Sequence, residues 1–281
     1  KFKKLLQKRT VLINDHMAKK SLITLTSDFG YRDPFVGIMQ GVMLGINPSL
    51  QFIHLTHNIE AHNILQATYV FETAYSYFPA GTIHLVVVDP GVGSKRKSLL
   101  VKSEKYCFIA PDNGVLSAVF QKEKGLEVYQ IDPEKFISGK ISFTFHGRDV
   151  FAPAAGLFSL NHDPAKLAHR VESCKKIALP YPQKIDTHSF SGEVIYIDRF
   201  GNLITNFSER FMCQHIDRKP IKIKIGSCVI TGLKSHYSEA NPREVSALIN
   251  SWNNIEIFLS SANAADFLKT RVGDVVEIET G

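Results

Sequence analysis

The chain has 281 residues, of which 44% are hydrophobic and 21% are charged, and its formal net charge is +6 at pH 7. This length exceeds what one hydrophobic core usually organises, so two domains are expected. No run of about eighteen apolar residues occurs, which argues against a membrane-spanning helix. The composition is that of an ordinary globular protein, with no repeat period and no low-complexity tract.

Residues 1–20 are basic and are interpreted as a leader that is disordered or not native to the protein, because Met17 stands just before the first strand-like run. They lack the apolar segment and cleavage site of a signal peptide, which favours a cytoplasmic protein. Much of the net charge lies here, so a solvated basic surface is expected rather than nucleic-acid binding. The four cysteines form no Cys-x-x-Cys pair and indicate neither a disulfide framework nor a structural zinc site.

Strand-like and helical patterns alternate through the first half of the chain. In chain order they are a strand beginning at Leu22, a helix over 34–46, a strand over 51–55, a helix over 61–78, a continuous apolar strand over 82–88, strands over 99–101 and 106–110, and a helix beginning at 114–120. This alternation predicts right-handed crossovers and an α/β domain with a doubly wound, mostly parallel sheet.

Polar residues follow three of these strands directly: Asp28, Asp89, and the pair Asp112 and Asn113. In doubly wound sheets ligands bind beyond the carboxyl ends of the strands. The sequence therefore predicts a ligand site formed by these three strand ends.

Beyond about residue 163 the pattern changes to short strands with little helix, at 192–197, 221–225, 255–259 and 274–278. This pattern predicts a small β-barrel or sandwich. The predicted organisation is an N-terminal α/β domain over 21–165, a linker over 166–190 and a C-terminal β domain over 191–281.

Three motifs combine polar residues with glycine. The segment DPGVGSKR runs from Asp89 to Arg96 and matches neither the Walker A loop nor the dinucleotide fingerprint. On pattern alone it is either a structural turn closed by an ion pair or part of a ligand site. His146, in TFHGRD, is either a structural or a catalytic histidine. The segment at 198–206 is either part of a ligand site or a β-turn whose asparagines serve only the backbone geometry.

Taken together and in this order, TSDFG, VVDPGVGS, APDNG, TFHGRDVFAPAA and DRFGNLITN resemble the S-adenosylmethionine hydroxide adenosyltransferase family, the relatives of the fluorinase and chlorinase enzymes. The resemblance extends from Ser21 to the C-terminus. It implies hydrolysis of S-adenosylmethionine to adenosine and methionine, without a cofactor or metal. It also implies a homotrimer whose active sites lie between subunits.

The resemblance implies a water-handling triad of Asp89, Arg96 and His146. Asp89 and Arg96 would polarise the water. The identity of the residue that takes its proton stays open, and His146 is one candidate. The resemblance also assigns substrate contacts to Asp28, Phe78, Asn113, Gly147, Asp198, Phe200 and Asn202.

The pair His146-Gly147 separates the hydrolases from halide-using relatives, because fluorinase-like sequences have Tyr-Ser and chlorinase-like sequences Tyr-Gly at these positions. The alternatives are a halide-using adenosyltransferase and a non-catalytic nucleoside or S-adenosylmethionine sensor, and the complete triad disfavours both. The chain departs from the family at 61–63, where Ala-His-Asn replaces Pro-aromatic-Asp, and at 260–263, where an Arg-Gly pair is missing. His54, His57 and His62 match no strong metal-ligand spacing.

Overall fold

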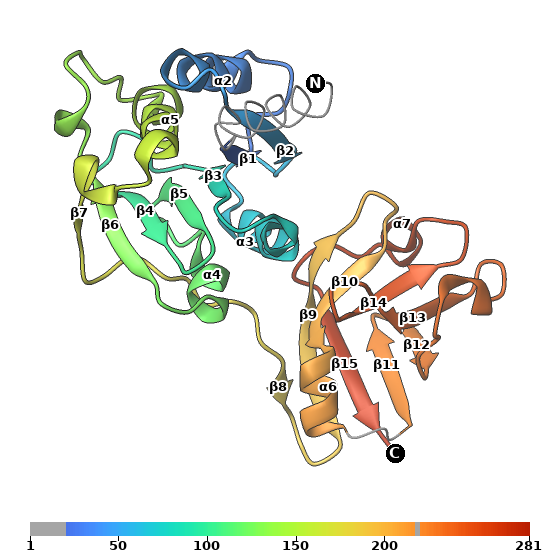
Figure 1. Ribbon diagram of the computed structural model, residues 1–281. Coiled ribbons are helices and arrows are strands. Elements are labelled where there is room, and N and C mark those ends of the chain that lie inside the picture. The colour runs from blue at the N-terminus through green and yellow to red at the C-terminus, as the bar shows by residue number, and fades with distance from the viewer. Residues whose placement is uncertain (1–20, 217–219) are drawn as a thin grey trace, which may run out of the picture. The chain divides into compact units, whose positions relative to one another are not determined.

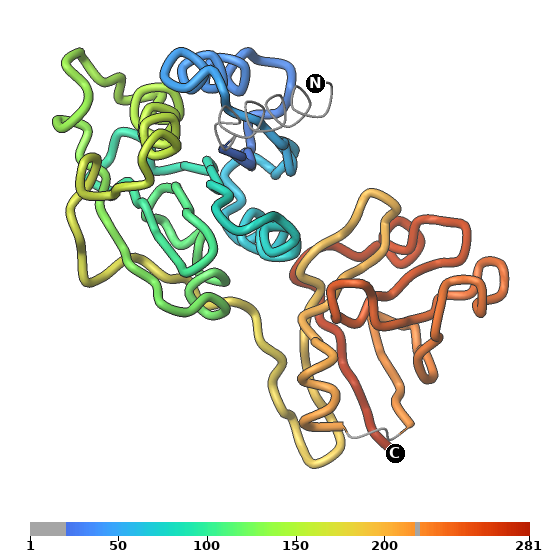
Figure 2. Tube along the Cα trace, viewed as in Figure 1, coloured from blue at the N-terminus to red at the C-terminus, as the bar shows by residue number. Residues whose placement is uncertain are grey.

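The computed structural model describes residues 21–216 and 220–281 (Figure 1). The predicted leader at 1–20 lies outside the described residues. The chain divides after Ile177 into two compact units, each with its own hydrophobic core. Figure 2 follows the chain as it passes from the first unit to the second once, through an extended stretch that includes β8 (Gln183–Lys184). This division falls inside the segment predicted as a linker.

A seven-stranded sheet forms the centre of the first unit, in the order β2-β1-β3-β5-β4-β6-β7. Strands β2, β1, β3 and β5 pair in parallel, whereas β4, β6 and β7 join through antiparallel pairs. Five of the seven strands therefore run in the same direction. The strands are β1 (Leu22–Ser27), β2 (Gln51–Thr56), β3 (Ile83–Val87), β4 (Ser98–Lys102), β5 (Cys107–Pro111), β6 (Glu127–Ile131) and β7 (Ala168–Arg170).

Helices cover both faces of this sheet. Helices α2 (Phe35–Ile46) and α5 (Ala152–Asn161) lie side by side over one face (Figure 1), and α3 (Ile64–Ala74) and α4 (Ser117–Lys122) pack together over the other. In β3, Leu85 and Val87 belong to the α2 core and Val86 to the α3 core. Because successive side chains of a strand point to opposite faces, burial on both sides requires a continuous apolar run. The predicted doubly wound α/β fold is confirmed.

Helix α3 is shorter than the predicted helix at 61–78. It begins after Asn63, whose Oδ1 accepts the Gln66 N–H at 2.9 Å, and the preceding His62 has a φ of 69°, which is incompatible with a right-handed helix. After Ala74 the chain tightens into the 3₁₀ turn η1 (Tyr75–Tyr77). The expectation was wrong at both ends because the cap and the turn, rather than the apolar periodicity, set the boundaries.

The second unit is an antiparallel sheet in the order β12-β11-β15-β9-β10-β14-β13, with β8 paired to β9. Lys234, which follows β12, donates its N–H to Ala247 of β13 at 2.7 Å, so the two ends of the order meet and the sheet is nearly closed. This confirms the predicted barrel-like β domain. Its remaining elements are β9 (Ser189–Ile197), β10 (Leu203–Ser208), α6 (Glu209–His215), β11 (Ile221–Ile225), β12 (Cys228–Thr231), β13 (Val245–Ile249), β14 (Asn254–Leu259), α7 (Ala264–Leu268) and β15 (Val275–Thr280).

None of the helices in the described part of the chain is long and apolar enough to cross a membrane.

A fully buried histidine lies on the α3 side of β3. His84 Nδ1 is 2.7 Å from Thr24 Oγ1, and its ring stacks on Phe108 with centroids 5.3 Å apart. Within the described residues His84 Nε2 has no hydrogen-bond partner. Burial lowers the pKa of His84 from 6.5 to about 3, so the folded protein holds this ring neutral.

The free energy of unfolding should fall as the pH drops below 6.5, because the unfolded chain protonates His84 while the folded protein, with its pKa of about 3, does not. The slope from this group should approach about 1.4 kcal/mol per pH unit between those two values. Urea unfolding from about pH 8 to about pH 5 measures it. His84→Phe should remove this contribution and reduce the slope, while the contribution of His57, whose pKa burial lowers to about 4, should remain. An unchanged slope in His84→Phe would contradict this account.

Candidate active site

The carboxyl ends of three neighbouring strands lie at one edge of the first unit's sheet. Strands β1, β3 and β5 are parallel and adjacent, and Ser27 at the end of β1 pairs with Val87 at the end of β3. Asp28 and Asp89 follow these two strands closely, so both carboxylates lie at the same edge. The predicted convergence of polar residues is therefore present for β1 and β3.

A pocket of about 340 Å³ opens at this edge, which is within the size range of small-molecule sites. Four residues suggested by the resemblance line it: Asp28, Asp89, His146 and Gly147. The other lining residues are Phe29, Asp33, Phe35, Ala61, His62, Val87, Val92, Thr144 and Phe145.

The turn after β3 returns the chain so that Arg96 lies against Asp89. The N–H of Val92 donates to the Asp89 carbonyl at 3.2 Å, and Gly93 has a φ of 78°. A Cβ at Gly93 would lie 2.3 Å from the Phe143 carbonyl oxygen, so no other residue fits there without displacing the backbone. This glycine is thus needed both for the turn and for its packing against the segment that carries His146.

All five N–H donors of Arg96 have protein acceptors. Nε donates to Asp89 Oδ1 at 2.8 Å, and Nη2 donates to Asp89 Oδ2 and to His146 Nδ1, the latter at 2.8 Å. Nη1 donates to Ser98 Oγ at 2.9 Å and to the Lys97 carbonyl at 3.3 Å. The side chains of Arg96 and Asp89 are only 9% and 6% exposed. The guanidinium is therefore fixed in one orientation, with its charge compensated by a bidentate carboxylate.

These contacts define the protonation of His146. Because a guanidinium can only donate hydrogen bonds, Nδ1 of His146 must be the acceptor and its ring proton must lie on Nε2. Burial lowers the pKa of His146, as does the Arg96 charge, while Asp89 and Asp149 oppose the shift. His146 is thus a neutral imidazole at neutral pH, with an N–H group rather than a lone pair on its second nitrogen.

Close packing surrounds Gly147, the first residue of the π-helical turn η3 (Gly147–Phe151) that leads into α5. A Cβ at this position would approach the Phe145 ring to 3.0 Å and Met39 Sδ to 3.1 Å. Any larger residue at this position would require these neighbours to shift.

Asp28 is held by a backbone group of the pocket lining. Its Oδ2 accepts the backbone N–H of His62 at 2.9 Å, and His62 adopts a left-handed backbone conformation that is uncommon for a non-glycine residue. The strained residue therefore presents its N–H to the carboxylate that the resemblance assigns to the ribose.

Three of the first unit's residues suggested by the resemblance do not line this pocket: Arg96, which bonds to the lining residues Asp89 and His146, and also Asn113 and Phe78. Asn113 is buried and uses its side chain to bind the Val88 carbonyl, at 2.8 Å, and the Val115 N–H, at 3.1 Å. Phe78 lies beside His84, with ring centroids 5.8 Å apart.

The remaining three residues belong to the second unit. Asp198 Oδ1 accepts the N–H groups of Phe200 and Asn202, at 2.8 and 2.9 Å, and Oδ2 accepts from Asn202 Nδ2 at 3.0 Å. Phe200 itself is 77% exposed.

Sequence reasoning missed an aromatic wall of the pocket. The Phe29 ring lies 5.4 Å from Phe35 and 6.1 Å from Phe145, and Phe35 and Phe145 are 5.2 Å apart. Two of the three stand inside the TSDFG and TFHGRD motifs, next to Asp28 and His146. That adjacency was the available signal, but a phenylalanine beside a motif is indistinguishable from a core residue without the fold.

A doubly wound α/β unit with a polar pocket at its carboxyl edge, followed in the same chain by an antiparallel barrel-like unit, defines a class of two-domain proteins. Family models for the N-terminal and C-terminal domains of the SAM hydroxide adenosyltransferases match residues 23–168 and 192–277. The chain belongs to this family.

Relatives and solved structures agree with this assignment. A curated (R)-S-adenosyl-L-methionine hydrolase from Methanocaldococcus jannaschii is 36% identical over 272 residues, covering 92% of this chain and 95% of the relative. One from Salinispora tropica is 28% identical over 273 residues, covering 94% and 100%. The crystal structure of an uncharacterized conserved protein from Thermotoga maritima superposes with a TM-score of 0.83 at 32% identity, covering 91% of this chain and 99% of that one.

His146 should remain neutral below the usual histidine pKa and carry its proton on Nε2. Nitrogen-15 NMR of the imidazole reports both the tautomer and the titration. Arg96→Ala should raise the pKa of His146, because it removes a positive charge while Asp89 remains. An Nδ1-protonated tautomer in the unchanged protein would contradict the described hydrogen bond.

Proposed function

We propose that this protein hydrolyses S-adenosylmethionine to adenosine and methionine, with water attacking the 5′ carbon of the ribose. The observation that carries the proposal is the assembly of Asp89, Arg96 and His146 at the pocket. Curated relatives bearing the hydrolase name support the substrate.

The proposed reaction is a displacement in which the C5′–sulfur bond breaks as the C5′–oxygen bond forms. The sulfonium leaves as a neutral thioether, so positive charge moves from sulfur to the attacking oxygen, and a preorganised pocket with little water favours this transfer. As the new bond forms, the oxygen becomes strongly acidic. A carboxylate paired with a guanidinium is then basic enough to take its proton, and we assign that role to Asp89.

His146 would orient the water rather than accept its proton. Its Nδ1 is occupied by Arg96, and its Nε2 carries the ring proton, so the neutral ring can donate to the water oxygen but can accept only after the Arg96 bond breaks. Arg96 has no N–H left for the water and would act through its charge and by holding the other two groups in place.

We further propose that Asp28 binds the ribose hydroxyls and that the aromatic wall of Phe29, Phe35 and Phe145 contacts the apolar part of the substrate. The pocket volume and the place of Asp28 on its lining support this. The further proposed contacts are Gly147, which lines the pocket, and Asp198, Phe200 and Asn202 of the second unit. Phe78 and Asn113 lie outside this pocket, and their contacts remain predictions from the resemblance. No cofactor is required by this scheme.

The proposed assembly is a homotrimer in which the first unit of one subunit and the second unit of its neighbour share an active site. The exposure of Phe200, whose backbone N–H is bonded to Asp198, supports a role in binding a partner or ligand. The proposed compartment is the cytoplasm, which is supported by the four unpaired cysteines, Cys107, Cys174, Cys213 and Cys228.

Incubation with S-adenosylmethionine, with and without chloride or fluoride, followed by chromatography, tests the reaction. The expected products are adenosine and methionine in every case. A halogenated adenosine would instead identify a halide-using transferase, and the absence of any product would identify a binding protein.

Arg96→Ala should lower kcat by about a hundredfold or more with a much smaller effect on KM.

Arg96→Lys provides the control for folding, because it retains a positive charge beside the nearly buried Asp89. An ammonium group cannot reproduce the five hydrogen bonds, so activity should not recover. Thermal melts confirm that each variant is folded. A folded Arg96→Lys protein with nearly normal kcat would show that the ion pair only closes the turn.

Shared active sites predict complementation between two inactive chains. Co-expressing Arg96→Ala with Asn202→Ala should restore part of the activity, because some mixed trimers would contain one site with both residues intact. The matched control pairs Arg96→Ala with Asp89→Ala, which alter the same unit and cannot complement. Equal activity of the two mixtures would place each site within one subunit.

A further inference from the structure

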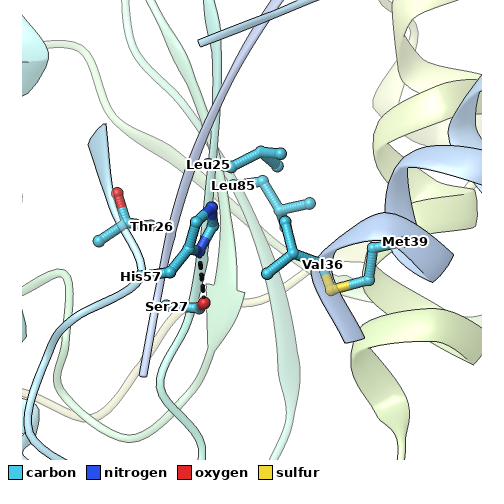
Figure 3. A pocket seen from close by; sticks show the side chains of 7 residues that line it. All are labelled: Leu25, Thr26, Ser27, Val36, Met39, His57 and Leu85. Atoms are coloured by element: carbon cyan, nitrogen blue, oxygen red, sulfur yellow. Dashed lines mark hydrogen bonds between the residues drawn. The ribbon is translucent and has the colours of Figure 1, made fainter. Parts of the chain in front are cut away.

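A buried histidine outside the proposed catalytic machinery holds the segment that carries Asp28. His57 follows β2 directly and is 2% exposed. Figure 3 shows its ring beside β1, with the hydrogen bond to Ser27 drawn and with Val36 and Met39 of α2 nearby. The cavity that these residues enclose is about 10 Å³, about enough for one water molecule and too small for a substrate. His57 is therefore not itself positioned to bind a ligand.

The segment after β1 is attached to His57 at three points. His57 Nδ1 lies 2.7 Å from Ser27 Oγ, and the His57 carbonyl accepts the Gly30 N–H at 2.7 Å. The Tyr31 ring packs edge-on against the imidazole with centroids 5.1 Å apart. Asp28 lies between the first two attachments, so its backbone is fixed on both sides by one residue.

The same ring is held from behind. His57 Nε2 is 2.6 Å from Nδ1 of His54, an exposed residue of β2 that in turn lies 3.3 Å from Gln40 of α2. One proton occupies the bond between the two imidazoles, whichever ring donates it. Burial, together with His54, lowers the pKa of His57 to about 4, so the ring is neutral near pH 7. Both ring nitrogens are thus committed to hydrogen bonds.

Ser27 transmits this constraint toward the pocket. Its Oγ accepts the Phe29 N–H at 3.3 Å as well as pairing with His57, and Phe29 belongs to the aromatic wall. The Asp28 carboxylate itself accepts the His62 N–H. Losing the bond between Ser27 and His57 would remove the side-chain restraint on one side of Asp28, while the Gly30 backbone bond and the carboxylate contact would remain.

We propose that His57 is a positioning residue that fixes Asp28 for substrate binding through its Nδ1 bond to Ser27. The inference rests on the proposed role of Asp28 in binding the ribose. It assigns to His57 an effect on affinity for the nucleoside and none on the chemical step, which takes place at Asp89, Arg96 and His146.

Two amide substitutions separate the two ring nitrogens. In His57→Asn the amide atoms occupy the place of Nδ1 and can keep the Ser27 bond, whereas in His57→Gln they occupy the place of Nε2 and can keep only the His54 bond. Each variant therefore retains one of the two hydrogen bonds, so thermal melts should change comparably. His57→Gln should raise KM and the Kd for adenosine about tenfold with kcat within about twofold, because an interaction common to ground and transition states is lost.

His57→Asn should keep both constants near those of the unchanged protein, and so should His54→Ala, which removes only the outer partner. Calorimetry with adenosine and steady-state kinetics measure them. Normal affinity in folded His57→Gln, or equal weakening in His57→Asn and His57→Gln, would overturn the proposal. Asp28→Asn is the reference. If it binds adenosine normally, the assigned role of Asp28 fails, and if the unchanged protein forms no adenosine, the proposed reaction fails.

Discussion

The parallel pairing of β1 with β3 is the constraint on which the site depends. It aligns Ser27 with Val87, so that the chain leaves both strands at the same level and places Asp28 and Asp89 at one edge. A shift of one residue would turn Ile23 and Leu25 away from the α2 core and bring the buried Thr24 and Thr26 into it. The difference between the two faces of β1 therefore favours this register and, with it, the relative positions of the two carboxylates.

Charge in this site is tolerated because it is fully paired. Arg96 and Asp89 are nearly buried, and a buried ion pair is stable only when its remaining donors are satisfied, as the five bonds of Arg96 are. The buried histidines His57 and His84 are instead kept neutral. They lie near the same strands but serve differently: His84 fills the aromatic core, whereas His57 supports a loop of the pocket.

Much of the fold could be predicted from local patterns. The continuous apolar run of β3 and the alternation of strands and helices indicated the doubly wound sheet, because a strand buried on two faces requires apolar residues at successive positions. The ends of α3 were not predictable from periodicity, since an asparagine cap and a left-handed His62 decide them. The pattern of short strands indicated the second unit, but its near closure depends on contacts between β12 and β13.

For the site, the sequence by itself determined which residue types stand at the strand ends and, through the order of its motifs, the family. Local pattern left open whether Asp89 and Arg96 form a turn or a site, only the resemblance grouped them with His146, and nothing suggested a link between His57 and Asp28. Only the tertiary structure shows the hydrogen bond between Arg96 and His146, fifty positions away, and thereby decides which ring nitrogen carries the proton. Hydrogen bonds between distant side chains depend on how the elements pack, and packing is a property of the whole chain that local patterns do not encode.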